Sequence, residues 1–265
     1  LTQKAVDNDV FAIFGPVYSG SIMVSMAESK RGETPNFTGG EAAAVTAQGN
    51  PYVFRTAFGQ SISFPKVARY LTAKSKKLAV LYVNNDFGKG GQATIKQLLA
   101  NSGTQIVTEI STEAGQVDFS AAVIQAKQSG ADALFAYTNE EESARLLREL
   151  RKQGWNKPVI GETVLTSAKV VELAGEAANG AVAHVGLTVE APQLQAFGKQ
   201  YQAMFNTGSD HNGVKGYTGM YVLKAAIEKA GKLDRKAAAA AIRNSCFSAK
   251  QYPGVLMDVC FDDKG

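Results

Sequence analysis

The segment FAIFGPVYSGSIMVSMAESK, residues 11–30, contains a short apolar run that changes abruptly into a helical pattern. Gly15-Pro16 breaks the apolar run, and Tyr18-Ser19-Gly20-Ser21 precedes the helical residues. A strand that leads directly into a helix is the building unit of α/β proteins. The hydroxyl and the glycine at this junction have two explanations. Either Ser19 caps the helix, which is worth ~1 kcal/mol, or the start of the helix is the floor of a binding site.

The same alternation continues along the chain as far as residue 185. Nearly continuous apolar runs predict strands that are buried on both faces, at Val10–Phe14, Leu78–Val83, Gln105–Ile110, Ala131–Tyr137, Lys157–Ile160 and Ala181–Val185. Apolar residues at helical spacing predict the helices Leu1–Asn8, Ser21–Lys30, Ser61–Ala73, Gly90–Ala100, Ser120–Gln128, Glu140–Gln153 and Ser167–Leu173. This order predicts an α/β protein with mainly parallel sheets flanked by helices.

The pattern changes after residue 192. Three helices are predicted in succession, at about 193–206, 214–230 and 234–243, and a strand follows at Val255–Phe261. Helices without intervening strands indicate that the chain returns here to a different part of the structure. The segments 54–59 and 185–192 are extended and rich in small residues, and are therefore expected to be joints.

Composition excludes several classes of function. The 265 residues have 45% hydrophobic and 20% charged residues, which is ordinary for a globular protein of one large or two medium domains. The net charge is +4, and the basic residues form no stripe with aromatic residues, so nucleic-acid binding is not expected. No apolar run approaches the roughly 20 residues of a membrane span. His184, His211 and the two cysteines are too far apart for a metal site, and no cofactor is expected.

Cys246 and Cys260 are the two cysteines of the chain. A disulfide across the intervening turn region fits an oxidising compartment. Two unrelated buried thiols fit the sequence about equally well.

Ligands of open parallel sheets bind at the carboxyl ends of the strands, where the strand-to-helix loops gather. Taken singly, the polar residues of these loops are ordinary caps and turns, but a helix start beside glycine amides forms an anion site. Five loops carry such residues, at 15–21, 38–41, 84–88, 137–140 and 161–163.

Catalytic patterns are absent from the sequence. There is no G-x-S-x-G, P-loop or H-E-x-x-H motif. Neither histidine is predicted to lie in a strand-end loop with a partner, so a catalytic triad would lack its base. We therefore expect a site that binds and releases a ligand, and not an enzyme.

Six segments in this order resemble the leucine/isoleucine/valine-binding proteins, which are periplasmic solute-binding proteins of ABC transporters. They are Phe14-Gly-Pro-Val-Tyr-Ser-Gly20, Pro51-Tyr-Val-Phe-Arg-Thr56, Val80-Leu-Tyr-Val with Asp86-Phe-Gly88, Asp118-Phe-Ser120, Gly130-Ala-Asp-Ala133, and Leu173-Ala-Gly-Glu-Ala-Ala-Asn-Gly180. The resemblance extends over essentially the whole chain and implies a type I bilobed fold with the ligand in the interlobe cleft. It implies one lobe of residues 1–56 plus 190–258, a second of 57–189, and the start of a third crossover at 259–265. It also implies that the family's first strands precede Leu1, so that the first lobe is incomplete.

The resemblance also implies a ligand site. The serine at the position of Ser19, next to Tyr18, binds the ligand carboxylate together with loop amides at Gly39, Gly40 and Glu41. An aromatic residue at Phe87 covers the ligand. Asn139 and Thr163 occupy the positions of a tyrosine and of the glutamate that holds the α-amino group, and Glu162 could supply that charge instead. An anion at Glu41 would repel a carboxylate unless it points away, so another amino acid, an amide or a small aromatic acid remains open as the ligand.

The function expected from the resemblance is an extracytoplasmic receptor that captures an amino acid or a related small carboxylate or amide. Its partner would be the membrane permease of an ABC transporter. A ligand-sensing regulator of the same fold is the alternative function, and an α/β hydrolase-type enzyme is the third possible function.

Overall fold

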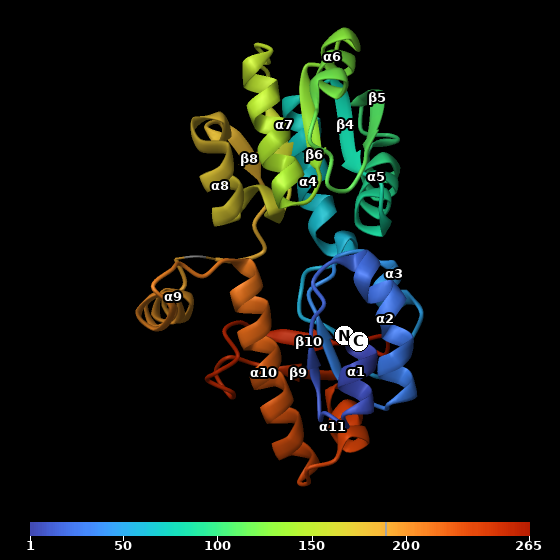
Figure 1. Cartoon of the computed structure of the whole chain (residues 1–265), viewed down its shortest axis with the longest axis vertical. Coiled ribbons are helices and arrows are strands. Elements are labelled where there is room, and N and C mark those ends of the chain that lie inside the picture. Colours follow the sequence, from blue (N-terminus) through green and yellow to red (C-terminus); the bar gives the residue numbers. More distant parts are fainter. Residues whose placement is uncertain (189) are drawn as a thin grey trace. The chain divides into compact units, whose positions relative to one another are not determined.

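The chain forms two compact units in a computed structural model that describes residues 1–188 and 190–265. Unit 1 combines Leu1–Gly59 with Thr188–Gly265, and unit 2 is the continuous segment Gln60–Leu187 (Figure 1). Each unit has its own sheet and its own core.

Unit 2 is built on a five-stranded sheet in which all strands are parallel, in the order β5-β4-β6-β7-β8. Its strands are β4 (Lys77–Val83), β5 (Gln105–Thr112), β6 (Ala133–Tyr137), β7 (Val159–Gly161) and β8 (Ala181–Ala183). Its helices are α4 (Gln60–Lys74), α5 (Asp86–Leu99), α6 (Ser120–Gln128), α7 (Glu140–Lys152), α8 (Ala168–Ala174) and the short 3₁₀ helices η1 (Thr163–Thr166) and η2 (Gly175–Ala178).

Helices cover both faces of this sheet. Leu78 and Val80 of β4 pack with α4 and α5 on one face, whereas Ala79 and Leu81 pack with α6, α7 and α8 on the other. Side chains alternate between the faces of a strand, so a strand covered on both sides must be apolar throughout. The continuous apolar runs of the sequence are explained by this arrangement.

Unit 1 contains a three-stranded parallel sheet in the order β1-β2-β3. Phe37 and Phe54 of this sheet pack against α10 and α11, and Val53 packs against α2 and α3. The elements are α1 (Thr2–Asp7), β1 (Ile13–Phe14), α2 (Ser19–Arg31), β2 (Asn36–Thr38), α3 (Ala44–Ala47), β3 (Val53–Arg55), α9 (Pro192–Phe205), α10 (His211–Ala230) and α11 (Arg235–Ile242).

The last part of the chain belongs to unit 1. Strands β9 (Ser245–Phe247) and β10 (Val259–Phe261) form an antiparallel pair in which Cys246 lies opposite Cys260. These cysteines form a disulfide with an S–S distance of 2.04 Å. Residues 259–265, which are expected to be the start of a third crossover, belong to unit 1. Phe261 contacts Phe54 edge to face, and the carbonyl of Gly265 accepts a hydrogen bond from the Arg55 amide.

The predicted α/β class with parallel, helix-flanked sheets is confirmed, but three strands were not predicted. These are β2, β3 and β9, each of three residues. Such segments are too short to show a period, and β3 lies where a joint was expected.

Candidate functional site

The strand-end loops of β1 and β2 are tied together in unit 1. The Gly15 amide donates to the Phe37 carbonyl at 2.7 Å, and the Thr38 hydroxyl donates to the Pro16 carbonyl at 2.9 Å. The Gly15-Pro16 peptide bond is cis. The loop that begins at Gly15 therefore lies beside the loop that follows Thr38, as expected for neighbouring parallel strands.

Ser19 is not the cap of α2. Tyr18, which is 55% exposed, occupies the N-cap position with an extended backbone, and Ser19 is the first helical residue. The Ser19 side chain is 1% exposed, and its Oγ accepts a hydrogen bond from the Ala42 amide at 3.2 Å. No described residue accepts the proton of this hydroxyl. Ser19 thus links the start of α2 to the loop after β2, and its hydroxyl proton donates to no described residue.

Gly40 packs directly on the start of α2. A Cβ atom at this position would lie 2.3 Å from Ile22 Cδ1 and 3.2 Å from Ser19 Oγ. The Gly40 amide donates to Thr38 Oγ1 at 3.4 Å. A Cβ at Gly39 would lie 3.3 Å from Lys215 Cδ, so this loop leaves little room for side chains.

Two cations hold the loop that contains Glu41. Lys215 Nζ lies 3.4 Å from Glu41 Oε1 and 3.4 Å from the Gly39 carbonyl oxygen. The Arg55 guanidinium donates to the carbonyls of Glu41 and Ala42 at 2.9 and 3.0 Å. Because Lys215 compensates the charge of Glu41, this anion does not leave the loop with a net negative charge.

Lys215 was not predicted as a site residue from the sequence. It lies on α10 four residues after His211 and three before Thr218, both of which are buried. A lysine on the buried face of an otherwise well-packed helix is the signal that would have identified it.

In unit 2, Phe87 is the second residue of α5 and is largely buried. Its ring stacks on Tyr137 with centroids 4.1 Å apart. The Gln60 side-chain amide donates to the Phe87 carbonyl at 2.8 Å and to the Tyr137 hydroxyl at 3.0 Å. Phe87, Tyr137 and Gln60 therefore form one packed cluster at the carboxyl ends of β4 and β6.

Glu162 and His184 form a buried pair at the ends of β7 and β8. His184 Nδ1 lies 2.6 Å from Glu162 Oε1, and the Thr163 amide donates to Glu162 Oε2. The Thr163 hydroxyl donates to the His184 carbonyl at 3.4 Å. The expectation that neither histidine has a strand-end partner was wrong. The predicted strand extended to Val185, whereas β8 ends at Ala183 and places His184 in the loop.

The Glu162 carboxylate is 2% exposed. Burial by itself raises the pKa of this carboxyl, but the hydrogen bonds from His184 and Thr163 outweigh burial and hold the pKa below its ordinary value of 4.5. Glu162 is therefore ionised at neutral pH, with both oxygens engaged.

Asn139 precedes α7 at the end of β6. Its side chain is partly buried and donates to Glu142 Oε1 at 3.3 Å, without capping the helix. Asn139 and the Glu162–His184 pair thus lie at the same edge of the unit 2 sheet, since β6, β7 and β8 are adjacent and parallel.

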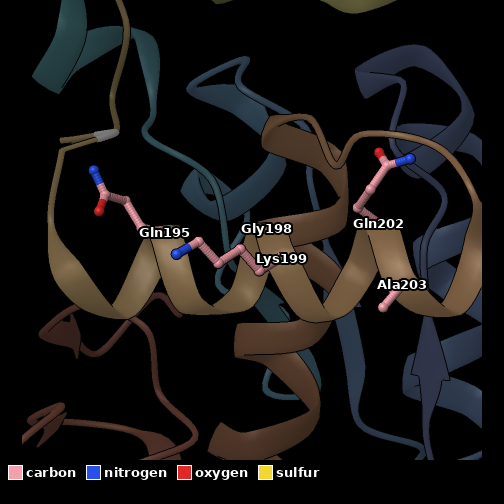
Figure 2. A pocket seen from close by; sticks show the side chains of 5 residues that line it. All are labelled: Gln195, Gly198, Lys199, Gln202 and Ala203. Atoms are coloured by element: carbon pink, nitrogen blue, oxygen red, sulfur yellow. The ribbon is translucent and has the colours of Figure 1, made fainter.

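A shallow depression on α9 lies apart from all these residues in the sequence. Figure 2 shows the residues that line it, strung along this one helix: Gln195, Gly198, Lys199, Gln202 and Ala203. None was predicted as a site residue, and the set combines one cation with uncharged side chains.

Unit 1 offers a hydroxyl donor and the first-turn amides of α2, which suit an anion. Within residues 1–188 and 190–265, no hydroxyl or thiol hydrogen-bonds to the His184 ring, and no group of His, Cys, Asp or Glu is arranged to hold a metal ion. None of the described helices is long and apolar enough to cross a membrane.

Comparison with known proteins defines the class. The whole chain, residues 1–265, matches the family of periplasmic binding proteins. The chain therefore belongs to this family, which confirms the resemblance seen in the sequence and the solute-binding class of function.

Two relatives in sequence are amino-acid-binding proteins. The leucine-, isoleucine-, valine-, threonine- and alanine-binding protein of Pseudomonas aeruginosa is 24% identical over 272 residues, covering 100% of this chain and 71% of that protein. The Leu/Ile/Val-binding protein BraC3 of Rhizobium johnstonii is 27% identical over 272 residues, covering 99% and 72%.

Solved structures show the same fold. The leucine-binding protein LivK of Thermotoga maritima has a TM-score of 0.88 at 23% identity, covering 100% of this chain and 76% of that chain. LivJ of Streptococcus pneumoniae in complex with isoleucine has a TM-score of 0.84 at 22% identity, covering 99% and 75%. An ABC-transporter solute-binding protein of Rhodopseudomonas palustris in complex with 3,4-dihydroxybenzoic acid has a TM-score of 0.87 at 20% identity, covering 99% and 74%. The type I periplasmic-binding-protein fold is thereby established.

Proposed function

We propose that this protein is the extracytoplasmic receptor of an ABC transporter and reversibly captures an amino acid or a related small carboxylate or amide. The observation that carries the proposal is the Ser19 hydroxyl of unit 1. It is buried at the start of α2, it is fixed by the Ala42 amide, and its proton has no acceptor among the described residues. A ligand carboxylate would supply that acceptor.

The surroundings of Ser19 support an anionic ligand group. The first-turn amides of α2 carry the positive end of the helix dipole. Gly39 and Gly40 allow close approach of the loop backbone, and Lys215 balances the charge of Glu41. In the proposed site Tyr18, Ser19, Gly39, Gly40 and Glu41 surround the carboxylate.

The proposed contribution of unit 2 comes from the carboxyl edge of its sheet. Asn139, Thr163 and the Glu162–His184 pair supply polar groups there. Phe87 contributes the rim of its stacked ring and holds Tyr137 in place.

The proposal assigns no catalytic step to the protein and gives it a membrane permease as partner. The chain belongs to the family of periplasmic binding proteins, and the similar solved structures include a solute-binding protein of an ABC transporter. The disulfide Cys246–Cys260 supports a location outside the cytoplasm, because disulfides persist in oxidising compartments.

A thermal-shift scan of amino acids, amides and small carboxylic acids tests the proposal. A ligand at a hundredfold excess over its Kd stabilises the native protein by about 2.7 kcal/mol. Calorimetric titration of the best compound should then show a Kd that is ~10- to 150-fold weaker for Ser19→Ala, because a hydrogen bond to a charged group is lost.

Ser21→Ala is the matched control, since Ser21 lies in the same helix turn but is exposed. It should bind like the unmodified protein. If no compound of these classes shifts the melting curve, the small-carboxylate proposal fails. If Ser19→Ala binds the compound as tightly as Ser21→Ala does, Ser19 only holds the loop after β2 in place and does not bind the ligand.

A further inference from the structure

The Glu162–His184 pair is the polar feature of unit 2 that bears most directly on the choice of ligand. Both residues lie at the carboxyl ends of adjacent parallel strands, where ligands of such sheets bind. Glu162 is buried, whereas the His184 side chain is 14% exposed. A ligand at this edge therefore meets the imidazole before it meets the carboxylate.

Direct access of a ligand cation to Glu162 is blocked by burial, because the Glu162 side chain is 2% exposed and the more exposed His184 ring contacts it. One of its oxygens contacts His184 Nδ1, the other accepts from the Thr163 amide, and the side chain is shielded from solvent. An ammonium group brought here would lose hydration and meet the imidazole, without a direct ion pair to the shielded carboxylate. An uncompensated buried charge is strongly unfavourable.

The second nitrogen of the His184 ring remains open. Nε2 has no hydrogen-bond partner among the described residues, and it is not among their buried unpaired polar atoms, so it reaches solvent. The contact between Nδ1 and Glu162 fixes the orientation of the ring. In a neutral ring with the proton on Nδ1, Nε2 accepts a hydrogen bond, and in a protonated ring it donates one.

A hydroxyl group suits this nitrogen in both protonation states, because it is both donor and acceptor. An ammonium group is only a donor and is repelled by a protonated ring. Resting on the solute-capture function proposed above, we propose that the Glu162–His184 pair makes this protein select small carboxylates that carry a hydroxyl where an amino acid carries its ammonium group.

Matched acids test this selection directly in the unmodified protein. The first series is L-leucine, L-2-hydroxy-4-methylpentanoate and 4-methylpentanoate, and the second is L-phenylalanine, L-3-phenyllactate and 3-phenylpropanoate. Within each series only the group beside the carboxylate changes. In the series whose side chain fits, the hydroxy acid should bind at least ~10-fold more tightly than both other members, since one hydrogen bond to a charged or buried group is at stake.

Ring-nitrogen NMR of the histidines gives a readout that a purely structural role would not move. The chain has two histidines, His184 in unit 2 and the buried His211 in unit 1, so the second serves as internal reference. Binding of the hydroxy acid should shift the Nε2 resonance of His184, with Nδ1 changing less.

Two variants complete the test. His184→Gln should bring the hydroxy acid and the amino acid to within a few-fold of each other in Kd. Glu162→Gln should reduce the preference by freeing the ring, whereas Glu141→Gln should leave it unchanged, since Glu141 is an exposed carboxylate of the same unit paired with Lys169. If these variants do not fold, the acid series and the NMR measurement decide alone.

The outcomes separate this inference from the function on which it rests. An amino acid that binds as tightly as its hydroxy counterpart overturns the selection but leaves solute capture intact. A bound hydroxy acid that leaves both His184 nitrogens unshifted also overturns it. If no acid of either series and no other small carboxylate binds, the proposed function itself is overturned.

Discussion

Lys215 is a lysine with a side chain that is 13% exposed, next to a Glu41 side chain that is 9% exposed. Removing one partner of a buried pair leaves the other charge poorly solvated, which costs more than the pair contributes. Lys215→Met should therefore lower the free energy of unfolding by about 3 kcal/mol. The double variant Lys215→Met/Glu41→Gln should regain most of this loss, as measured by urea unfolding. A double variant that is no more stable than the single one would show that Lys215 acts without Glu41.

Glu162 makes the free energy of unfolding of unit 2 depend on pH. Its pKa in the folded protein lies below 4.5, so the unfolded chain takes up a proton there more readily than the folded one. The stabilisation is fully present above pH 4.5 and is lost as the pH falls through the lower, folded-state pKa. We expect unfolding free energies of the unmodified protein to drop more steeply as the pH falls below 4.5 than those of Glu162→Gln. Parallel slopes for the two proteins would exclude this contribution.

Helix α5 packs tightly against the sheet at Gly91. A Cβ there would lie 2.2 Å from Tyr137 Cε1, so Gly91→Ala must displace the ring on which Phe87 stacks. Overpacking of this kind costs about 1–3 kcal/mol. The control is Gly216→Ala in α10, an exposed position where a Cβ would meet nothing within 4 Å. Gly216→Ala should stabilise by roughly 0.5–1 kcal/mol, because alanine favours the helix. Chemical unfolding of both variants should give opposite signs.

The sequence predicts elements best where burial is complete and length is sufficient. Strands β4 and β6 are apolar on both faces, and α6 was predicted with the bounds that it has, Ser120–Gln128. The three-residue strands β2 and β3 were missed because their hydrogen bonds to neighbouring strands, and not a local period, define them.

Some residues of the candidate site could likewise be predicted from the sequence, and others could not. The rule that ligands meet the ends of parallel strands located Ser19 and Gly40, which the structure brings into contact. The same rule failed for His184 because a strand predicted two residues too long hid it. The partnership of Glu41 with Lys215 joins residues that are 174 positions apart, which no local pattern reveals.

At the scale of the whole molecule, the two units carry separate probes. The disulfide lies in unit 1, and the single tryptophan, Trp155, is buried in unit 2. A disulfide that closes a loop of this size, with a sequence separation of 14, stabilises by about 3 kcal/mol. Reduction should therefore lower the urea midpoint for unit 1, seen by circular dichroism, and leave the Trp155 fluorescence midpoint in place. Cys246→Ser/Cys260→Ser, unreduced, should reproduce the effect. Equal shifts of both probes would mean that the units unfold together.

Unit 2 is one uninterrupted stretch of chain, whereas unit 1 is assembled from the segments before and after it. This connectivity has a consequence for synthesis on the ribosome, where domains fold as their sequence emerges. Phe37 and Phe54 are translated early, yet their partners on α10 and at Phe261 follow only after all of unit 2. We expect nascent chains that end between Leu187 and α10, and are joined to the ribosome by an unstructured linker that holds unit 2 outside the exit tunnel, to shield Trp155 from a fluorescence quencher. The first 59 residues should remain open to protease. Early protease resistance of those residues would show that the first segment folds without its later half.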